Sequence, residues 1–347
     1  MTSFRPRFAG RSAAALCAFM AVWCGATIAF GQSAEDFYKG KQLRLIVGFP
    51  AGNDYDLGAR LLVKYLPKYI PGHPNIIVQN MPQAASVAAA NYLYAQGPRD
   101  GTVIGSFSRN VVNEALTGQN LEADPRRFIW LGATSLPSRV CARWFTSPVK
   151  TPADLFTKEF IVGAAGAGSS LAILPTVLNH VLGTKFRIVE GYQGSNDALL
   201  AVERGELQGI CASYAQFRAS EQLIRDGKLL FLLRAEESAI PELPDVPSIF
   251  DYAKTDEQRQ LMRFVFSSTE FGRSYVFPPD VPKDRVEVMR KAIADAAHDP
   301  QLLAEAKSIH MDMAYTPPEH LEQLVTKLYA TPPNLIQTIK SILPNVK

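Results

Sequence analysis

The sequence has few of the side chains on which most catalytic and metal sites depend. It holds five histidines, and no two of them stand at the spacing of a metal site on a helix. The Gly-x-Ser-x-Gly elbow of serine hydrolases does not occur. Gly163–Ser170 has the glycines of a phosphate-binding loop, but Ser169 stands where the lysine belongs, and Leu171 replaces the third glycine of a dinucleotide fingerprint. We therefore expect no enzymatic activity, no metal and no cofactor.

An excess of charge of either sign is also missing once the N-terminal leader is set aside. The leader carries Arg5, Arg7 and Arg11, and removing these three from 36 basic residues leaves a formal charge of zero against 33 acidic ones. A basic nucleic-acid surface is therefore not indicated. Low-complexity tracts and internal repeats are absent too, which excludes a solenoid. With 347 residues and 47% hydrophobic content, the chain is long enough for two globular cores.

The N-terminus has the pattern of a signal peptide. Its three arginines precede Ser12–Phe30, which is uncharged and mostly apolar, and Ala29–Gly31 fits a small-x-small cleavage site. We predict a signal peptide over residues 1–31, cleaved near Gly31, and a periplasmic protein. The alternative is an uncleaved anchor, because the apolar stretch is just long enough to span a membrane. Small residues within the stretch and the cleavage pattern at its end favour cleavage.

Two cysteines, Cys141 and Cys211, remain after the leader, which takes Cys17 and Cys24 with it. An oxidising compartment permits a disulfide between them. Each is equally compatible with a small buried hydrophobic residue. Spacing alone does not show whether two cysteines meet, so both alternatives stay open.

Strand and helix patterns alternate twice along the rest of the chain. Residues 43–107 run strand, helix, strand, helix, strand, and residues 140–212 repeat a similar rhythm. This order predicts parallel α/β sheets. Helical patterns at Asp284–Ala297 and after Pro317 follow as a tail, so we expect two α/β units with a helical tail. The strands are expected at Leu43–Phe49, Asn75–Gln79, Thr102–Phe107, Val140–Phe145, Phe160–Gly163, Phe186–Val189 and Leu207–Ala212.

Four strand-to-helix loops share one design of small residues before a helix start. The first N–H groups of a helix lack intrahelical partners and lie at the positive end of its dipole, so these loops suit an anion. Parallel sheets bind ligands beyond the carboxyl ends of their strands. Loops from two units therefore predict a cleft between them. The loops are Pro50–Asp56, Pro82–Ser86, Ala164–Ser170 and Tyr192–Asn196.

The polar side chains of these loops have both functional and structural interpretations. Asp54 and Asp56 fit helix capping, and we assign Asp56 first to holding its loop while facing the ligand. Arg109 is the best cationic candidate for a ligand carboxylate, or else a solvated loop charge. Tyr192 either contacts the ligand or packs against the neighbouring loop. Ser169 suits a helix cap better than a nucleophile, because no base is evident.

Eight short motifs stand in order along the mature chain: Leu45–Gly52 with Asp56 and Ala59–Leu61; Val78–Pro82 with Ala89–Tyr94; Pro98–Thr102; Gly166–Ser170; Gly191–Gly194; Arg204–Glu206; Leu243–Ser248; and Phe277–Pro282. Together they resemble the Bug, or tricarboxylate-receptor, family of solute-binding proteins. The resemblance covers nearly all of the mature chain. Two loops depart from the family pattern. Asn53 replaces a glycine of the first loop, and Gln83-Ala84-Ala85 replaces Gly-Ala-Gly in the second, so the Asn53 and Gln83 side chains are expected to contact the ligand.

The resemblance implies a two-lobed periplasmic-binding-protein fold of the second type, each lobe a mostly parallel sheet flanked by helices. Residues 32–136 and 268–347 would form lobe 1, and residues 137–267 lobe 2, with crossings near Ser135–Arg139 and Ser267–Gly272. The lobes would close on a small organic carboxylate, and the monomeric receptor would deliver it to membrane subunits of a tripartite tricarboxylate transporter. The expected ligand-binding residues are Ala51, Gly52, Asn53, Asp56, Gln83, Ala84, Ser86, Ser108, Arg109, Ala167, Gly168, Ser169, Ser170, Tyr192 and Gly194.

Two other functions remain compatible with the sequence. An exported hydrolase or transferase would use Ser169 or Asp56, although no base–nucleophile pair is evident. A receptor of the same fold would alternatively serve a sensor protein.

Overall fold

The computed structural model describes Met1 and residues 37–117, 121–135, 138–166, 169–217, 220–237, 243–309 and 311–342. The chain divides into residues 1–33 and residues 34–347, and the account below concerns the second unit. The predicted leader and its cleavage site lie outside the described ranges, as do Ala167 and Gly168. Within the described ranges, every helix is too short or too polar to cross a membrane.

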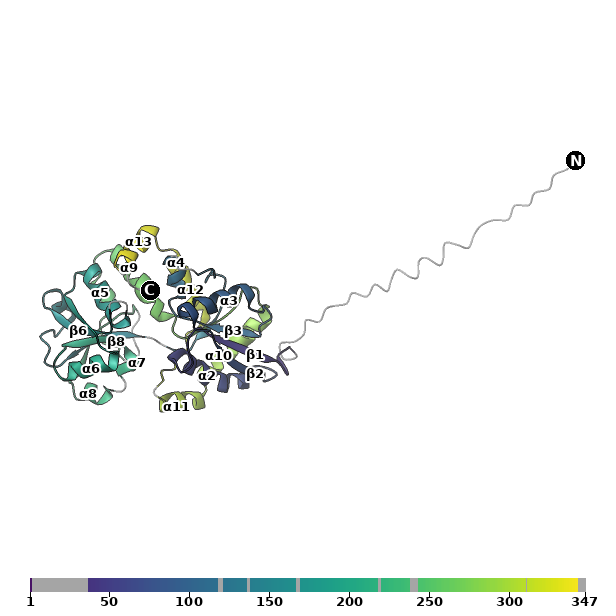
Figure 1. Ribbon diagram of the computed structural model, residues 1–347, viewed down its shortest axis with the longest axis horizontal. Coiled ribbons are helices and arrows are strands. Elements are labelled where there is room, and N and C mark those ends of the chain that lie inside the picture. The colour runs from purple at the N-terminus through teal and green to yellow at the C-terminus, as the bar shows by residue number, and fades with distance from the viewer. Residues whose placement is uncertain are drawn as a thin grey trace. The chain divides into compact units, whose positions relative to one another are not determined.

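The first sheet has five strands in the order β2-β1-β3-β10-β4 (Figure 1). Its strands are β1 (Gln42–Val47), β2 (Asn75–Asn80), β3 (Val103–Ser106), β4 (Ile129–Ala133) and β10 (Ser274–Phe277). Strands β1, β2 and β3 are parallel, and β10 runs antiparallel between β3 and β4. Helices α2 (Asp54–Tyr65) and α3 (Val87–Gln96) connect the parallel strands. Because β2 and β3 lie on either side of β1, right-handed connections put these helices on opposite faces of the sheet.

The second sheet repeats this plan in the order β7-β6-β8-β5-β9. Its strands are β5 (Arg139–Trp144), β6 (Phe160–Ala164), β7 (Phe186–Glu190), β8 (Gly209–Ser213) and β9 (Leu229–Arg234). Strands β6, β7 and β8 are parallel and joined by α5 (Ser170–Leu182) and α6 (Ser195–Glu203), whereas β5 is antiparallel to both of its neighbours. Each sheet is thus mostly parallel and flanked by helices, which confirms the predicted fold class (Figure 1).

The remaining helices follow or connect the two sheets. The α-helices are α4 (Val111–Thr117), α7 (Tyr214–Phe217), α8 (Glu221–Arg225), α9 (Asp256–Glu270), α10 (Lys283–Ala297), α11 (Pro300–Ser308), α12 (Pro318–Tyr329) and α13 (Pro333–Ile342). Short 3₁₀ turns lie at Leu66–Tyr69, Gln83–Ser86, Pro152–Phe156 and Ile249–Tyr252. Helix α9 contacts α5 of the second sheet as well as α4, α12 and α13. Its buried side chains, such as Met262 and Phe264, belong to a core cluster that includes residues of both sheets.

The chain passes between the sheets twice. It leaves β4 at Ala133 and enters β5 at Arg139, and it returns through α9 to β10 at Ser274. The two passages are hydrogen-bonded to each other, because the amide of Thr134 donates to the Arg273 carbonyl at 3.1 Å and the Arg273 amide donates to Ser135 Oγ at 2.9 Å. The lobe boundaries at residues 136 and 267 stay a prediction, since α9 shares its core with both sheets.

The two mature cysteines are disulfide-bonded. Cys141 of β5 and Cys211 of β8 stand directly opposite each other in the antiparallel ladder, with 3.9 Å between their Cα atoms. Both side chains are fully buried. The disulfide therefore links two neighbouring strands of the second sheet, and its cysteines are 70 residues apart in the sequence.

Candidate functional site

The loop between β1 and α2 is fixed from within by one carboxylate. Asp56 is 1% exposed, and its Oδ2 accepts from the Gly52 amide at 2.8 Å and from Arg60 Nε at 2.9 Å. Its Oδ1 accepts from Asn80 Nδ2 at 2.8 Å, which ties the loop to the end of β2. Burial alone would raise the pKa of Asp56, but the hydrogen bonds from Arg60, Gly52 and Asn80 lower it below its ordinary value. Asp56 thus remains charged and holds the loop.

The start of α2 is capped by Asn53 rather than by either aspartate. Asn53 Oδ1 accepts from the Tyr55 amide at 2.9 Å, which satisfies one of the helix's orphan donors. The capping interpretation of Asp54 and Asp56 is therefore wrong, because the residue just before them already fills that position. Gly52 has a φ of +82°, a backbone conformation that favours glycine. Ala51, Gly52 and Asn53 are exposed at the carboxyl edge of the first sheet, although the Gly52 amide donates to Asp56 and the Asn53 amide donates to the Pro50 carbonyl.

The loop between β2 and α3 presents two exposed residues and hides a third. Gln83 and Ala84 are exposed, whereas Ser86 is fully buried and donates its hydroxyl to the Gly48 carbonyl at 2.7 Å. A Cβ on Gly48 would lie 2.3 Å from Ser86 Oγ, so this contact requires glycine. Ala84 and Ser86 have φ values of 50° and 84°, in a region that most side chains avoid. The Ser86 side chain therefore links the first two loops, and the residue as a whole is shielded from solvent.

The loop after β3 is bound to both α2 and the second passage through one tyrosine, Tyr55. Tyr55 accepts from the Arg109 amide at 3.2 Å and donates its hydroxyl to the Gly272 carbonyl at 3.1 Å. The Tyr55 ring stacks on Phe49, with 4.4 Å between ring centroids. Next to Arg109, Ser108 Oγ accepts from the Asn110 amide at 3.2 Å. The half-buried Arg109 side chain is thus carried by a loop whose backbone is positioned from two directions.

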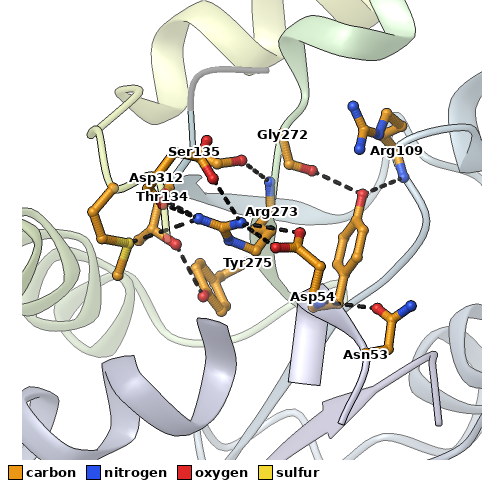
Figure 2. A network of polar contacts seen from close by, with 11 residues as sticks. Asn53, Asp54, Arg109, Thr134, Ser135, Gly272, Arg273, Tyr275 and Asp312 are labelled. Carbon is orange, nitrogen blue, oxygen red and sulfur yellow. Dashed lines mark hydrogen bonds and ion pairs between the residues drawn. The ribbon is translucent and has the colours of Figure 1, made fainter. Parts of the chain in front are cut away.

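A buried arginine lies beside this loop and joins three parts of the chain (Figure 2). The Arg273 side chain is 3% exposed, and its Nη1 lies 3.0 Å from Asp54 Oδ2 and 3.2 Å from Asp312 Oδ1. Its Nη2 donates to the carbonyls of Asp312 and Thr134. Burial alone would lower the pKa of Arg273, but the two carboxylates raise it, so the guanidinium stays charged. No local pattern in the sequence indicates this cluster, because Asp54 and Arg273 are 219 residues apart.

The second sheet contributes its own loops at the carboxyl ends of β6 and β7. Ser169 stands at the N-cap position of α5 but makes no capping bond, and its buried hydroxyl has no hydrogen-bond partner among the described residues. Ser170 begins the helix. In the next loop, the Tyr192 amide donates to the Ala164 carbonyl at 3.3 Å, and the Tyr192 ring covers Gly163.

The loop before α6 repeats the arrangement seen before α2. Gly194 directly precedes α6, and the carboxylate of Asp197 accepts from the Gln193 amide at 3.1 Å, as Asp56 does from Gly52. Burial, with Glu206 and Asp197 nearby, raises the pKa of Tyr192, so its hydroxyl remains a neutral donor. Each sheet therefore carries a loop that an aspartate in the first helical turn holds in place.

The structure groups the predicted site residues into two sets. Residues 51–56, 83–86 and 108–109 follow the adjacent strands β1, β2 and β3, and residues 169–170 and 192–194 follow the adjacent strands β6 and β7. Asp56 and Ser86 direct their side chains into the protein, whereas residues 51–53 and 83–84 are exposed. Sequence reasoning missed Tyr55 and Arg273, whose positions depend on contacts with residues far away in the chain.

Comparison with known proteins gives one curated relative. No protein-family model matches the chain. A Cupriavidus necator protein described as "UPF0065 protein in gbd 5′ region" is 26% identical over 228 residues, which is 63% of this chain and 66% of that protein. The chain thus matches just under two thirds of the length of this relative.

Several solved structures share the fold. A TctC solute-binding protein from Polaromonas is 22% identical with a TM-score of 0.69 and matches 87% of this chain and 99% of its own. The periplasmic binding protein BugD is 18% identical, with a TM-score of 0.54 over 88% of this chain and 98% of that one. An R. palustris protein solved with adipate is 17% identical, with a TM-score of 0.54 over 88% and 97%.

These likenesses place the chain in a structural class. Its fold is the two-lobed fold of periplasmic binding proteins, as the sequence predicted. Two of these neighbours are, by their names, a TctC solute-binding protein and the Bug-type binding protein BugD, in agreement with the resemblance found in the sequence motifs.

Proposed function

We propose that this protein is a periplasmic receptor of the tricarboxylate-transporter type, which captures a small organic carboxylate between its two lobes. The observation that carries the proposal is the loop edge of the first sheet. There, the exposed residues 51–53 and 83–84 lie on the loops that follow β1 and β2, Arg109 follows the adjacent strand β3, and the buried charge of Asp56 holds the first loop in shape. Exposed loops at the positive ends of helices, with a cation on a neighbouring loop, suit a carboxylate.

The loops of the second sheet would complete the site when the lobes close. Ser169 offers a buried hydroxyl that has no hydrogen-bond partner among the described residues, and Tyr192 offers a neutral phenol. A ligand that contacts both sets of loops binds the closed form better than the open form and shifts the equilibrium towards closure. One of the solved neighbours was crystallised with adipate, a dicarboxylate, which supports this ligand class.

The receptor would act by binding rather than by catalysis, as a monomer that delivers its ligand to membrane subunits of a tripartite transporter. Delivery has a direct test in the cell that produces the protein. Deleting the receptor should abolish uptake of the radiolabelled ligand, and restoring it should not rescue uptake in a strain that lacks the membrane subunits. Uptake that persists without the receptor would contradict the transport role.

Binding is tested by a thermal-shift screen of the mature protein against mono-, di- and tricarboxylates. A ligand at 100 times its Kd stabilises by about 2.7 kcal/mol, which should raise Tm by roughly 5 °C. Arg109→Gln and Tyr192→Ala should reduce this shift without unfolding the protein. Arg187→Gln is the matched control, because Arg187 is an exposed residue of β7 that pairs only with exposed Glu159 among the described residues. Unchanged binding in both site variants would contradict the proposed location of the site.

A further inference from the structure

One tyrosine hydroxyl joins a loop of the proposed site to the second passage between the sheets. Tyr55 stands in the first turn of α2, next to the Asp56 carboxylate that holds the first loop. Tyr55 is 6% exposed, and its ring stacks on Phe49. Its hydroxyl accepts from the Arg109 amide at 3.2 Å and donates to the Gly272 carbonyl at 3.1 Å. The hydroxyl thus uses its acceptor towards the loop after β3 and its donor towards the passage.

These two hydrogen bonds depend on each other. A hydroxyl that accepts a hydrogen bond donates more strongly, because each bond polarises the other. Losing the bond to Gly272 therefore weakens the bond to the Arg109 amide. Within the described ranges, the other hydrogen bonds of residues 108–110 stay inside the loop and helix α4. Tyr55 is therefore what holds the backbone of this loop against the rest of the first sheet.

Gly272 is the residue through which the second passage leaves α9. Helix α9 ends at Glu270 and β10 begins at Ser274, and Gly272 between them has a φ of +51°, which glycine adopts without strain. Its amide donates to the Thr269 carbonyl of α9 at 3.2 Å, whereas its carbonyl accepts from Tyr55 of α2. Helix α9 shares its core with both sheets. A rotation of α9 against the first sheet therefore redirects the carbonyl that Tyr55 binds.

The next residue fixes the two passages to each other and to the start of α2. The Arg273 amide donates to Ser135 Oγ at 2.9 Å, and its carbonyl accepts from the Thr134 amide at 3.1 Å (Figure 2). The Arg273 guanidinium lies 3.0 Å from the carboxylate of Asp54, the neighbour of Tyr55 in the sequence. Both passages and the start of α2 thus form one bonded unit. Movement of the lobes bends the chain beyond this unit, towards α9 and β5.

We propose that Tyr55 is a positioning residue for ligand capture, which couples the loop that carries Arg109 to the second passage at Gly272. Anion binding at the loop and closure of the lobes then favour each other, and by the same factor, because couplings between binding equilibria are reciprocal. The inference rests on the proposed carboxylate receptor and adds how its site responds to closure. Tyr55 acts through the Arg109 backbone rather than by contact with the ligand.

Three variants of the mature protein isolate this link. Tyr55→Phe keeps the aromatic ring and its stacking but removes both hydrogen bonds. Tyr38→Phe is the matched control, because Tyr38 is a fully buried phenol that donates to the Gly101 carbonyl at 3.3 Å, before the start of β3. Ser135→Ala perturbs the first passage without altering the loop, since Ser135 Oγ accepts from the Arg273 amide. Combining Ser135→Ala with Tyr55→Phe completes a double-mutant cycle.

Hydrogen exchange of the ligand-free protein, followed by mass spectrometry, reports on the loop directly. Residues 107–111 and 270–274 should exchange about tenfold faster in Tyr55→Phe than in the unmodified protein, and should be unaffected in Tyr38→Phe. Ser135→Ala should speed exchange at residues 107–111 about fivefold, but should add nothing in the Tyr55→Phe background. Calorimetric titration with adipate should give a Kd about tenfold higher for Tyr55→Phe and unchanged for Tyr38→Phe.

The outcomes separate this link from the proposed function. Exchange at residues 107–111 that is unchanged in Tyr55→Phe, or that Ser135→Ala speeds equally with and without the Tyr55 hydroxyl, overturns the link. Adipate that binds Tyr55→Phe as tightly as the unmodified protein retains the receptor but overturns the positioning role. The expected exchange pattern, without adipate binding by the unmodified protein, supports the link and counts against the proposed function. Should Tyr55→Phe fail to fold, Ser135→Ala decides, because exchange at residues 107–111 as slow as in the unmodified protein overturns the link.

Discussion

Replacing Arg273 with methionine should cost far more stability than replacing its exposed partner Asp54. Methionine has similar length but removes the charge and the donors to the Thr134 and Asp312 carbonyls. Removing one partner of a buried pair costs about 3 to 5 kcal/mol, because the remaining charge loses its compensation. The lower end applies here, since Asp54 is 58% exposed and regains water easily, while Asp312 is 17% exposed and does not.

The variant Asp54→Asn breaks the same ion pair at its exposed end, so comparing it with Arg273→Met isolates the effect of burial on stability. Because the Asp54 side chain is mostly exposed, this variant should lose less than about 1 kcal/mol of stability. Urea unfolding followed by tryptophan fluorescence and far-UV circular dichroism measures both variants, and Arg187→Met serves as the exposed control. At about 3 kcal/mol, Arg273→Met should also lower Tm by roughly 5 °C. The reasoning is refuted if Arg273→Met loses no more stability than Asp54→Asn.

Three further perturbations have expected outcomes. Replacing Cys141 and Cys211 with serine opens a closed loop of 70 residues, which should lower the free energy of unfolding by about 4 kcal/mol. Reducing the disulfide of the unmodified protein should likewise lower Tm, and a loss of stability under about 1 kcal/mol would contradict the closed-loop argument. Burial raises the pKa of Glu114 to about 7, so the folded state holds a proton that the unfolded state releases, and the free energy of unfolding should fall as pH rises from 4.5 through 7. In urea unfolding from pH 4 to pH 8, Glu114→Gln should remove about 1 to 3 kcal/mol of that fall, and an unchanged pH profile would refute the assignment. Asp56→Ala leaves the Gly52 amide, Arg60 and Asn80 without their acceptor, so it should lower the free energy of unfolding in urea by about 2 kcal/mol. Calorimetry should also show weaker carboxylate binding, whereas unchanged binding would show that the loop does not need the Asp56 carboxylate.

Much of the fold could be predicted because its signals are local. The strand at residues 42–47 is a short apolar run, and the helix that follows has its cap and acidic first turn within four residues. Alternation of such units specifies parallel connections without any long-range information. Strand β4 and helix α9 were not predicted, and neither was the insertion of β10 between β3 and β4. That insertion pairs Val276 with Gly105, and no local pattern specifies such a partner.

In the candidate site, too, local contacts could be predicted and long-range contacts could not. The role of Asp56 in holding its loop could be predicted because its amide partner lies four residues away. The partner of Asp54 could not, since Arg273 reaches it from beyond the second sheet. Gly58 is a residue whose role depends on a distant contact. A Cβ at this position would lie 2.7 Å from Arg273 Nε, so the glycine within helix α2 makes room for a side chain 215 positions later.

The position of β10 also sets the order in which the protein can mature. All strands of the second sheet lie within residues 139–234, so that sheet and its disulfide can form from one continuous stretch of chain. The first sheet has to wait for residues 274–277 to enter between β3 and β4, which brings together segments about 170 residues apart. We expect pulsed hydrogen exchange during refolding to protect β6 and β8 before β3 and β4. An emerging chain would then carry a finished second sheet while the first sheet still lacks its antiparallel strand, and a chaperone that binds exposed strand edges would engage β3 and β4 during that interval.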